Sequence, residues 1–216
     1  MATILRSWSY RYPWFYGSVA RLAALTVGGY AQLHRLPLQG IRLQGQDRVL
    51  DLCCGPGEAT SFLLQHSQRV TGLDASPRAL AEARRRFPQT EFVEGFAQAM
   101  PFPDASFEVV HISLALHEWP QSVILEVLRE IGRVLTPDGL LLALDLHTPQ
   151  QAWIWPGLAA FLLAFETETA WDFLGMALPD HLTACGFGEC RQALHAFGSL
   201  QVLQASRGQA GARWYV

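Results

Sequence analysis

Between residues 48 and 146 the apolar positions of the chain alternate between two patterns. Short apolar runs bounded by turn residues are typical of buried strands, whereas apolar residues three and four positions apart share one face of a helix. The runs predict strands at 48–52, 69–73, 90–94, 107–112 and 139–146. The spaced stretches predict helices at 58–67, 77–87 and 121–135.

Further signals support two of these helices. Ser76 and Pro77 stand where an N-cap and a first helical residue are expected. The third helix has an apolar face made of Val123, Val127, Ile131 and Val134. Strands that alternate with helices imply right-handed crossovers and a parallel sheet with helices on both faces. The expected fold is therefore α/β, Rossmann-like and doubly wound.

The pattern changes on both sides of this core. Residues 1–44 are aromatic and then aliphatic, with a helix expected before Pro37 that is broken near Gly28-Gly29. Residues 152–165 carry no charge, are interrupted at Pro156-Gly157, and fall short of the roughly twenty residues of a membrane-spanning helix. Three interpretations stay open for this segment: a core helix, an apolar lid over a substrate cavity, or an interfacial segment.

The remaining residues return to sheet chemistry. A helix is expected at 178–185, followed by strands at 193–197 and 200–205 that are joined at Gly198-Ser199 as a hairpin. An antiparallel edge of this kind is common on a parallel sheet. The 216 residues suit one domain. Its four predicted parts are an N-terminal cap (1–44), a cofactor-binding core (45–147), an apolar cap insertion (148–177) and a C-terminal helix with hairpin strands (178–216).

Composition excludes several classes of function. The formal net charge is −3, and the one basic run, Arg84-Arg85-Arg86, falls late in a predicted helix where cations suit the helix dipole. A nucleic-acid partner is therefore not expected. The chain has no lysine, which rules out a Schiff base, a Walker-type phosphate lysine and a kinase lysine.

The cysteines and the N-terminus bear on the compartment. Cys53 and Cys54 are adjacent, Cys185 and Cys190 lie far along the chain, and no C-x-x-C spacing signals zinc or redox chemistry. The first residues lack the continuous apolar core of a signal peptide. A cytoplasmic protein is expected, placed at a membrane surface if the interfacial interpretation of 152–165 holds.

Candidate chemistry gathers at one edge of the predicted sheet. The first strand, with Asp51, runs into the turn Gly55-Pro56-Gly57, and the second strand ends at Asp74. This edge is where nucleoside cofactors bind, and a carboxylate such as Asp74 can accept from ribose hydroxyls. Thr60 replaces the third glycine of a dinucleotide turn, and Glu58 would repel a pyrophosphate. S-adenosylmethionine, which has a sulfonium, an ammonium and a carboxylate but no phosphate, fits better.

Five ordered motifs extend this interpretation. They are residues 49–58 (VLDLCCGPGE), 70–77 (VTGLDASP), 92–104 (FVEGFAQAMPFPD), 106–111 (SFEVVH) and 128–139 (LREIGRVLTPDG). With them the chain resembles the class I S-adenosylmethionine-dependent methyltransferases, most closely the quinone- and sterol-type branch. The resemblance is dense over residues 47–147 and loose in the tail. It implies a mostly parallel seven-stranded sheet whose last strand is antiparallel.

The resemblance also implies roles for individual residues. The methionine part of the cofactor would be held by the turn, and the ribose by Asp74. The loop at 95–98 would cup the adenine, although Phe96 stands where the family often has a carboxylate and could stack on the base instead. The implied cofactor-binding residues are Asp51, Cys53, Gly55, Gly57, Asp74, Ala75, Ala97, Gln98, His111 and Ser113.

Methyl transfer to a hydroxyl or an acidic carbon also calls for a base. His117 and Glu118 follow the fourth strand, and Asp145 and His147 lie at the end of the fifth, so all four are candidates. A structural hydrogen-bonding role for the two histidines is the alternative. A metal site built from His111, His117, Asp145 and His147 would lack a recognised ligand spacing, so no metal is expected.

The expected acceptor is an apolar small molecule such as a quinone, a phenol or a lipid-like compound. Aromatic residues of the two cap segments could line its pocket, or could simply be core residues; they are Tyr12, Trp14, Phe15, Tyr16, Trp153, Trp155 and Phe161. Weak peripheral contact with a membrane stays open, and the sequence makes no statement about oligomeric state. The competing functions are a non-catalytic methyltransferase-like binding protein and, with less support, a nicotinamide-dependent oxidoreductase.

Overall fold

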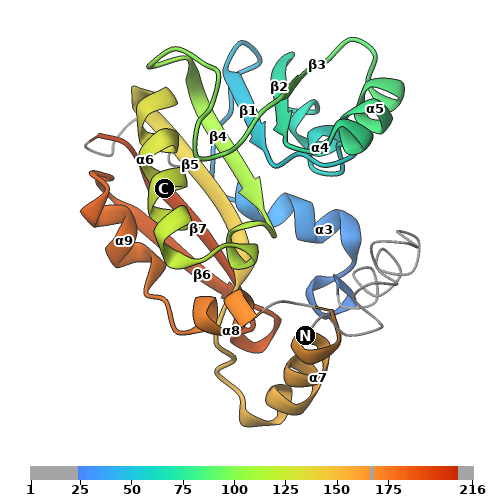
Figure 1. Cartoon of the computed structure of the whole chain (residues 1–216), viewed down its shortest axis with the longest axis vertical. Coiled ribbons are helices and arrows are strands. Elements are labelled where there is room, and N and C mark those ends of the chain that lie inside the picture. The colour runs from blue at the N-terminus through green and yellow to red at the C-terminus, as the bar shows by residue number, and fades with distance from the viewer. Residues whose placement is uncertain (1–23, 166–167, 209–216) are drawn as a thin grey trace.

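The computed structural model describes residues 24–165 and 168–208, which form a three-layer α/β fold around one seven-stranded sheet (Figure 1). The strand order is β3-β2-β1-β4-β5-β7-β6, and β7 alone runs against its neighbours. The expected Rossmann-like sheet with an antiparallel last strand is confirmed. The strands are β1 Arg48–Leu52, β2 Arg69–Asp74, β3 Glu91–Glu94, β4 Phe107–Ser113, β5 Leu135–Leu146, β6 Cys190–His195 and β7 Leu200–Ser206.

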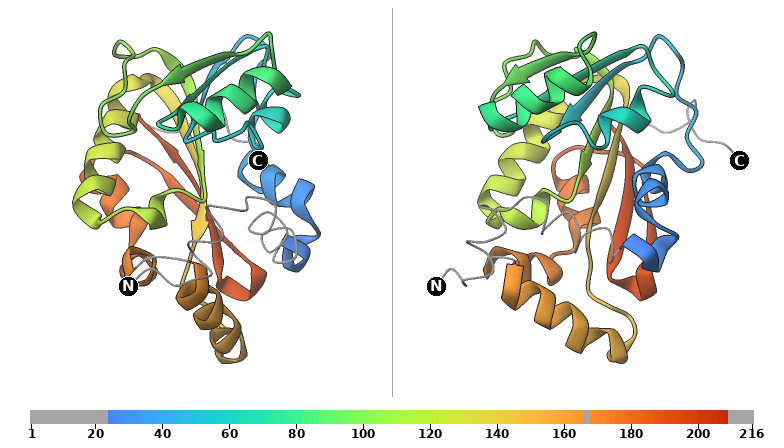
Figure 2. Two further views of the ribbon diagram at one scale, coloured as in Figure 1. Left: turned by 45° about the vertical axis from the view of Figure 1, so that its right-hand side comes forward. Right: turned by 90° about the vertical axis from the view of Figure 1, so that its right-hand side faces the viewer.

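Helices cover both faces of the sheet (Figure 2). The described α-helices are α3 Tyr30–Arg35, α4 Thr60–Leu63, α5 Pro77–Arg86, α6 Gln121–Val134, α7 Trp155–Phe165, α8 Glu168–Leu174 and α9 Leu178–Ala184. Short 3-10 turns complete the connections: η1 Leu25–Val27, η2 Leu36–Leu38, η3 Leu116–Glu118, η4 Ala152–Ile154 and η5 Ala196–Gly198. No helix in the described ranges is long and apolar enough to cross a membrane.

The alternation of side chains along the strands divides the core between the two faces. Leu50 and Val110 point to one face and join α6, α8 and α9 in the largest apolar cluster. Val49 and Val109 point to the other face and pack with Leu63 of α4. Because successive strand residues alternate in this way, Asp51 and His111 lie on the α4 side of the sheet.

Most predicted elements appear within one or two residues of their expected bounds, and three do not. The strand expected at 193–197 is β6, which begins three residues earlier, at Cys190, and ends at His195. The helix expected at 58–67 begins at Thr60 and ends at Leu63, because i→i+3 hydrogen bonds such as that from His66 N–H to the Leu63 carbonyl tighten the chain beyond it. The strand expected at 139–146 begins earlier, at Leu135. On α6, Val123 is only half-buried, whereas Ile124 is fully buried.

The apolar segment after β5 also differs from expectation. Pro156-Gly157 does not interrupt it, because Pro156 falls in the first turn of α7, where its missing N–H has no helical partner to lose. The helix lies beyond the carboxyl end of β5, at one end of the molecule (Figure 1). The aromatic residues Tyr12, Trp14, Phe15 and Tyr16 of the N-terminal cap lie outside the described residues.

Candidate functional site

The turn after β1 presents a bare stretch of backbone at the carboxyl edge of the sheet. Cys53, Gly55 and Gly57 have φ angles of 58°, 53° and 84°, which are left-handed conformations that glycine adopts without steric cost. A Cβ built on Gly55 would meet no atom within 4 Å, so the space beside this residue is open. At Gly57 a Cβ would come within 2.8 Å of the Phe87 ring. Gly57 is therefore required for packing against Phe87. At Gly55 the absence of a side chain leaves the backbone open to a ligand.

Asp74 joins the end of β2 to this turn. Its Oδ2 accepts the Gly55 N–H at 2.8 Å, and its Oδ1 accepts the Ser76 N–H at 2.8 Å. Ser76 in turn caps α5 by accepting the Ala79 N–H at 3.3 Å, as the sequence predicts. A carboxylate has about four lone-pair sites, so both oxygens can still accept from a ligand. The geometry is consistent with the predicted ribose role of Asp74.

Asp51 is buried beneath the turn rather than open to it. Its Oδ2 accepts the Thr60 hydroxyl at 2.5 Å, and its Oδ1 lies 3.0 Å from Nδ1 of His111, its register partner on β4. Thr60 stands where a dinucleotide-binding turn has its third glycine. Its hydrogen bond to Asp51 therefore links the start of α4 to β1. Asp51 and His111 are placed to support the turn from below.

The turn is also held from the outside. The guanidinium of Arg86, in the basic run at the end of α5, donates to the Pro56 carbonyl at 2.8 Å and pairs with Glu58 at 3.2 Å. Both side chains of this pair are partly exposed, so the pair contributes little to stability. Glu58 nevertheless lies in the turn, as the sequence predicts.

The residues predicted on the adenine side follow β2 and β3. Ala75 and Gln98 are exposed, and Ala97 is buried. Phe96, which replaces the usual carboxylate, is 63% exposed at a narrow turn in which the Ala99 N–H donates to its carbonyl. Ser113 ends β4 half-buried, beside the buried His111. An exposed aromatic ring at this position leaves a surface on which a base can stack.

His117 and Asp145, two of the four candidate bases, form a buried pair. Nδ1 of His117 lies 2.5 Å from Oδ1 of Asp145, and Oδ2 of the same carboxylate accepts the N–H groups of Ala115 and Leu116 at 3.2 and 2.8 Å. Because a carboxylate can only accept, Nδ1 carries the proton and Nε2 is the basic nitrogen. The sequence identifies both residues but not their pairing, which follows from the adjacency of β4 and β5 in the sheet.

The other two candidates have different surroundings. Nδ1 of His147 faces the carbonyls of Thr148 and Gly198 at 2.8 and 2.9 Å, which ties it to the loop before β7. Glu118 is exposed at the end of η3. Within residues 24–165 and 168–208 no group of three His, Cys, Asp or Glu side chains is arranged to hold a metal ion.

A cavity of about 390 Å³ has Phe173, a ring neighbour of His117, in its wall, although neither His117 nor Asp145 lines it. Its wall includes Phe173, whose ring centroid is 6.4 Å from that of His117, together with Trp119 and Met176. Polar groups of Gln121, Asp172 and His181 complete it. The size and the mixed lining suit a small ligand with an apolar body and a few polar groups.

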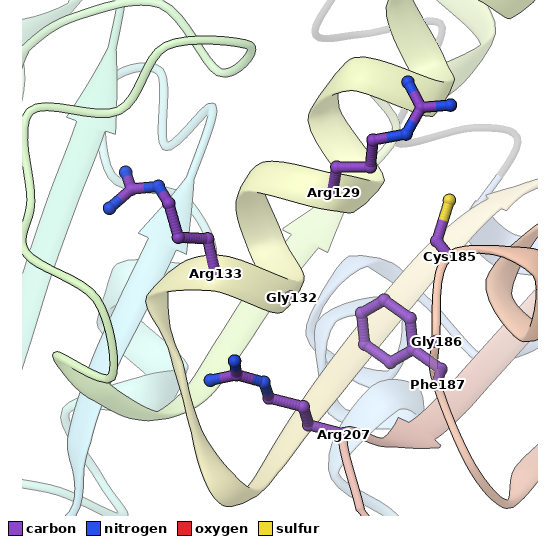
Figure 3. Close-up of a pocket in the computed structure, with 7 residues that line it drawn as sticks. All are labelled: Arg129, Gly132, Arg133, Cys185, Gly186, Phe187 and Arg207. Atoms are coloured by element: carbon purple, nitrogen blue, oxygen red, sulfur yellow. The ribbon is translucent and has the colours of Figure 1, made fainter.

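A second cavity, of about 430 Å³, lies at the opposite edge of the sheet, where β5 begins (Figure 3). Arg129, Arg133 and Arg207 line it, but their guanidinium groups point in different directions (Figure 3). That of Arg133 is bound to Glu130 and Asp104. This cavity does not present converging cations to a ligand and is far from the turn after β1.

Comparisons with known proteins identify the family of the chain. The profile of the methyltransferase domain family matches residues 49–139. An uncharacterized methyltransferase of Synechocystis is 47% identical over 205 residues, which cover 95% of this chain and 97% of the relative. A 2-phytyl-1,4-naphtoquinone methyltransferase of Thermosynechococcus vestitus is 34% identical over 155 residues, 63% of this chain and 68% of that protein.

The fold has solved counterparts. An S-adenosylmethionine-dependent methyltransferase of Thermotoga maritima, described as a possible histamine N-methyltransferase, superposes with a TM-score of 0.66 at 17% identity. The match covers 94% of this chain and 99% of that one. At this identity the likeness concerns the fold.

The sheet order and the glycine turn define a Rossmann-like α/β fold, which the solved counterpart shares. With a relative that matches it along nearly its whole length, the chain belongs to the methyltransferase family, and its cofactor is S-adenosylmethionine. The residues fit this molecule: the backbone at Gly55 is open, Asp74 retains acceptor capacity, and Glu58 disfavours a phosphate.

Proposed function

We propose that this methyltransferase acts on an apolar small molecule with an acidic hydroxyl, such as a reduced quinone or a phenol. The observation that carries the proposal is the buried His117–Asp145 pair, whose imidazole meets the edge of Phe173, a residue that lines the cavity. The name of the Thermosynechococcus relative, which specifies a phytyl naphthoquinone, supports the same class of acceptor. The pair provides a base, and the cavity provides an apolar surface for an aromatic ring.

The proposed mechanism assigns separate tasks to the two halves of the site. Bound S-adenosylmethionine supplies a methyl group that is already activated on a sulfonium. Asp51 and His111 are proposed to support the bound cofactor from beneath the turn. The full set of residues proposed to hold it is Asp51, Cys53, Gly55, Gly57, Asp74, Ala75, Ala97, Gln98, His111 and Ser113. The task left to the protein is to align the acceptor, exclude water and remove a proton.

His117 is the proposed base. With its Nδ1 proton donated to Asp145, Nε2 can take the proton of an acceptor hydroxyl. The carboxylate stabilises the imidazolium that results, and the Ala115 and Leu116 N–H groups hold that carboxylate in place. Glu118, which is exposed, and His147, whose Nδ1 faces two backbone carbonyls, are proposed to border the acceptor site rather than to move the proton.

The apolar end of the molecule supports a lipid-soluble acceptor. Trp153, Leu163 and Phe197 are 63%, 65% and 50% exposed, and the rings of Trp153 and Phe197 meet edge to face at 4.8 Å. The helix α7, which includes Leu163 and follows Trp153 in the chain, contains no charged residue. An apolar helix flanked by an exposed tryptophan suits the interface of a membrane. We propose a weak peripheral contact through these exposed residues, while the buried Leu162 packs α7 against the largest apolar cluster, as the core-helix interpretation expects.

A substrate panel tests this function. Methyl transfer from labelled S-adenosylmethionine is measured with a reduced naphthoquinone bearing an isoprenoid chain, with the same head group without a chain, and with a water-soluble catechol. The chain-bearing quinol is expected to react fastest. Preference for the catechol would overturn the apolar acceptor, and binding of the cofactor without transfer to any of the three would favour a non-catalytic role.

A further inference from the structure

His34 on α3 is a buried polar side chain that no mechanism above uses. The residue is 6% exposed, and neither ring nitrogen has a hydrogen-bond partner among the described residues. Its ring is stacked on Phe62 of α4, with centroids 5.3 Å apart, and meets the edge of Tyr30 at 4.6 Å. A buried polar group without a partner costs free energy, so its presence calls for an explanation.

The position of His34 supplies one. Phe62 belongs to α4, the helix that starts directly after the glycine turn. The charged and titratable groups that act on His34 are Glu58 in that turn, and Asp51 and His111 beneath it. The His34 imidazole, which has no hydrogen-bond partner among the described residues, therefore lies near the turn after β1, where the cofactor site begins.

The protonation state of His34 matches one chemical group in particular. Burial, and secondarily the proximity of His111, lowers the pKa of His34 from 6.5 to about 4, so the ring is neutral at neutral pH. A neutral imidazole offers one N–H donor and one acceptor nitrogen. An amino-acid zwitterion offers the converse, a carboxylate that accepts and an ammonium that donates. Asp51 lies beneath the turn, where it accepts the Thr60 hydroxyl and lies 3.0 Å from Nδ1 of His111.

Two glycines stand directly before α3, the helix that carries His34. Gly28 and Gly29 directly precede the helix and have φ angles of 91° and 103°. A Cβ built on Gly29 would meet no atom within 4 Å. Both φ angles lie in the region that favours glycine.

We propose that His34 binds the amino-acid end of the cofactor, an assignment that rests on the cofactor stated above but not on the identity of the acceptor. A ligand that completes the two open hydrogen bonds removes the cost of burying them. The same residue would then be unfavourable in the empty protein and favourable in the complex. A role in packing alone would need only a flat ring, which phenylalanine also supplies.

Calorimetry with two ligands tests this assignment. S-adenosylhomocysteine has the amino-acid end, whereas 5′-methylthioadenosine lacks it and is otherwise alike. In His34→Phe the affinity for S-adenosylhomocysteine is expected to fall about tenfold, as for loss of a hydrogen bond to a charged group. The affinity for 5′-methylthioadenosine is expected to stay the same. His66→Phe, at an exposed histidine in the segment after α4, is the matched control and should change neither value.

Two further measurements guard against a misfolded variant. The unfolding temperature of ligand-free His34→Phe is expected to equal or exceed that of the wild type, since the open polar groups are gone. His34→Gln, which restores a donor and an acceptor, should recover part of the lost affinity. An unchanged affinity for S-adenosylhomocysteine, or equal losses for both ligands, would overturn the assignment of His34. Absence of S-adenosylhomocysteine binding by the wild type would overturn the cofactor as well, whereas a failed acceptor panel would leave His34 unaffected.

Discussion

The Nδ1 atom of His117 and the Oδ1 atom of Asp145 are 2.5 Å apart in the interior of the protein. His117 lies in η3, just past the end of β4, and Asp145 lies near the end of β5, so the pairing of these two strands sets the distance. Each side chain is at least 97% buried. A histidine held this firmly by a carboxylate has its second nitrogen directed by the protein rather than by solvent.

If Nε2 of His117 is the base, replacing the ring should remove proton transfer and leave cofactor binding intact. His117→Ala is expected to lower kcat by about 10² to 10⁴, the usual contribution of general base catalysis. Asp145→Asn should lower kcat less, because it perturbs the orientation of the ring without removing it. Single-turnover methyl transfer measures the loss, and calorimetry with S-adenosylhomocysteine should give wild-type affinity for both variants. His147→Ala is the control and should keep most of the wild-type kcat. If His147→Ala lowers kcat as much as His117→Ala does, His117 is not the specific base.

Asp74 links two backbone N–H groups and is proposed to hold the ribose. Asp74→Ala should therefore lower affinity for S-adenosylhomocysteine at least about tenfold, as expected when hydrogen bonds to a carboxylate are lost. The affinity for adenosine alone should fall by a similar factor, since adenosine contains the same ribose. Asp138→Ala, an exposed carboxylate at the opposite edge of the sheet, provides the comparison. Wild-type affinity in Asp74→Ala would mean that the ribose binds elsewhere.

The pattern of the sequence predicts the sheet well because the chain obeys simple periodicities there. The Asp51 and Asp74 strand ends and the Ser76 cap of α5 follow from local signals, and the structure places them as expected. The end of α4 at Leu63 could not be predicted, because the tight turns beyond it depend on backbone bonds with no side-chain signature.

The site shows the same division between local and long-range information. Cys53 takes a left-handed conformation in the position where a glycine would be expected, which no residue preference signals. The His117–Asp145 pair could have been predicted from strand order, since residues after neighbouring parallel strands meet at one edge. His34 could not, because a lone histidine in an apolar stretch reveals neither its burial nor its lack of partners.

The depressed pKa of His34 has a consequence for stability as a function of pH. The unfolded chain binds a proton at His34 near pH 6.5 and the folded protein only near pH 4, so between these values the unfolded state holds more protons. This residue should therefore make the protein less stable as pH falls from about 6.5 to 4, by at most about 1.4 kcal/mol per pH unit. Urea unfolding of the wild type and His34→Phe across this range isolates the effect, because all other titrating groups are common to both. Parallel pH profiles for the two proteins would contradict a buried, neutral His34.

The exposed apolar side chains of Trp153, Leu163 and Phe197 offer a direct test of the proposed membrane contact. Burying these two rings and Leu163 in the outer part of a bilayer removes apolar surface from water, at about 25 cal/mol per Å². The double variant Trp153→Ser and Leu163→Ser should therefore bind liposomes of a neutral phospholipid several-fold less tightly than the wild type in a sedimentation assay. Because α7 carries no charge, the binding should change little with salt.

The exposed Phe96, at the adenine side of the cofactor turn, gives the matched control: Phe96→Ser should leave liposome binding unchanged. Equal binding by the wild type and the double variant would place the contact elsewhere, and strong salt dependence would assign it to charged lipids instead.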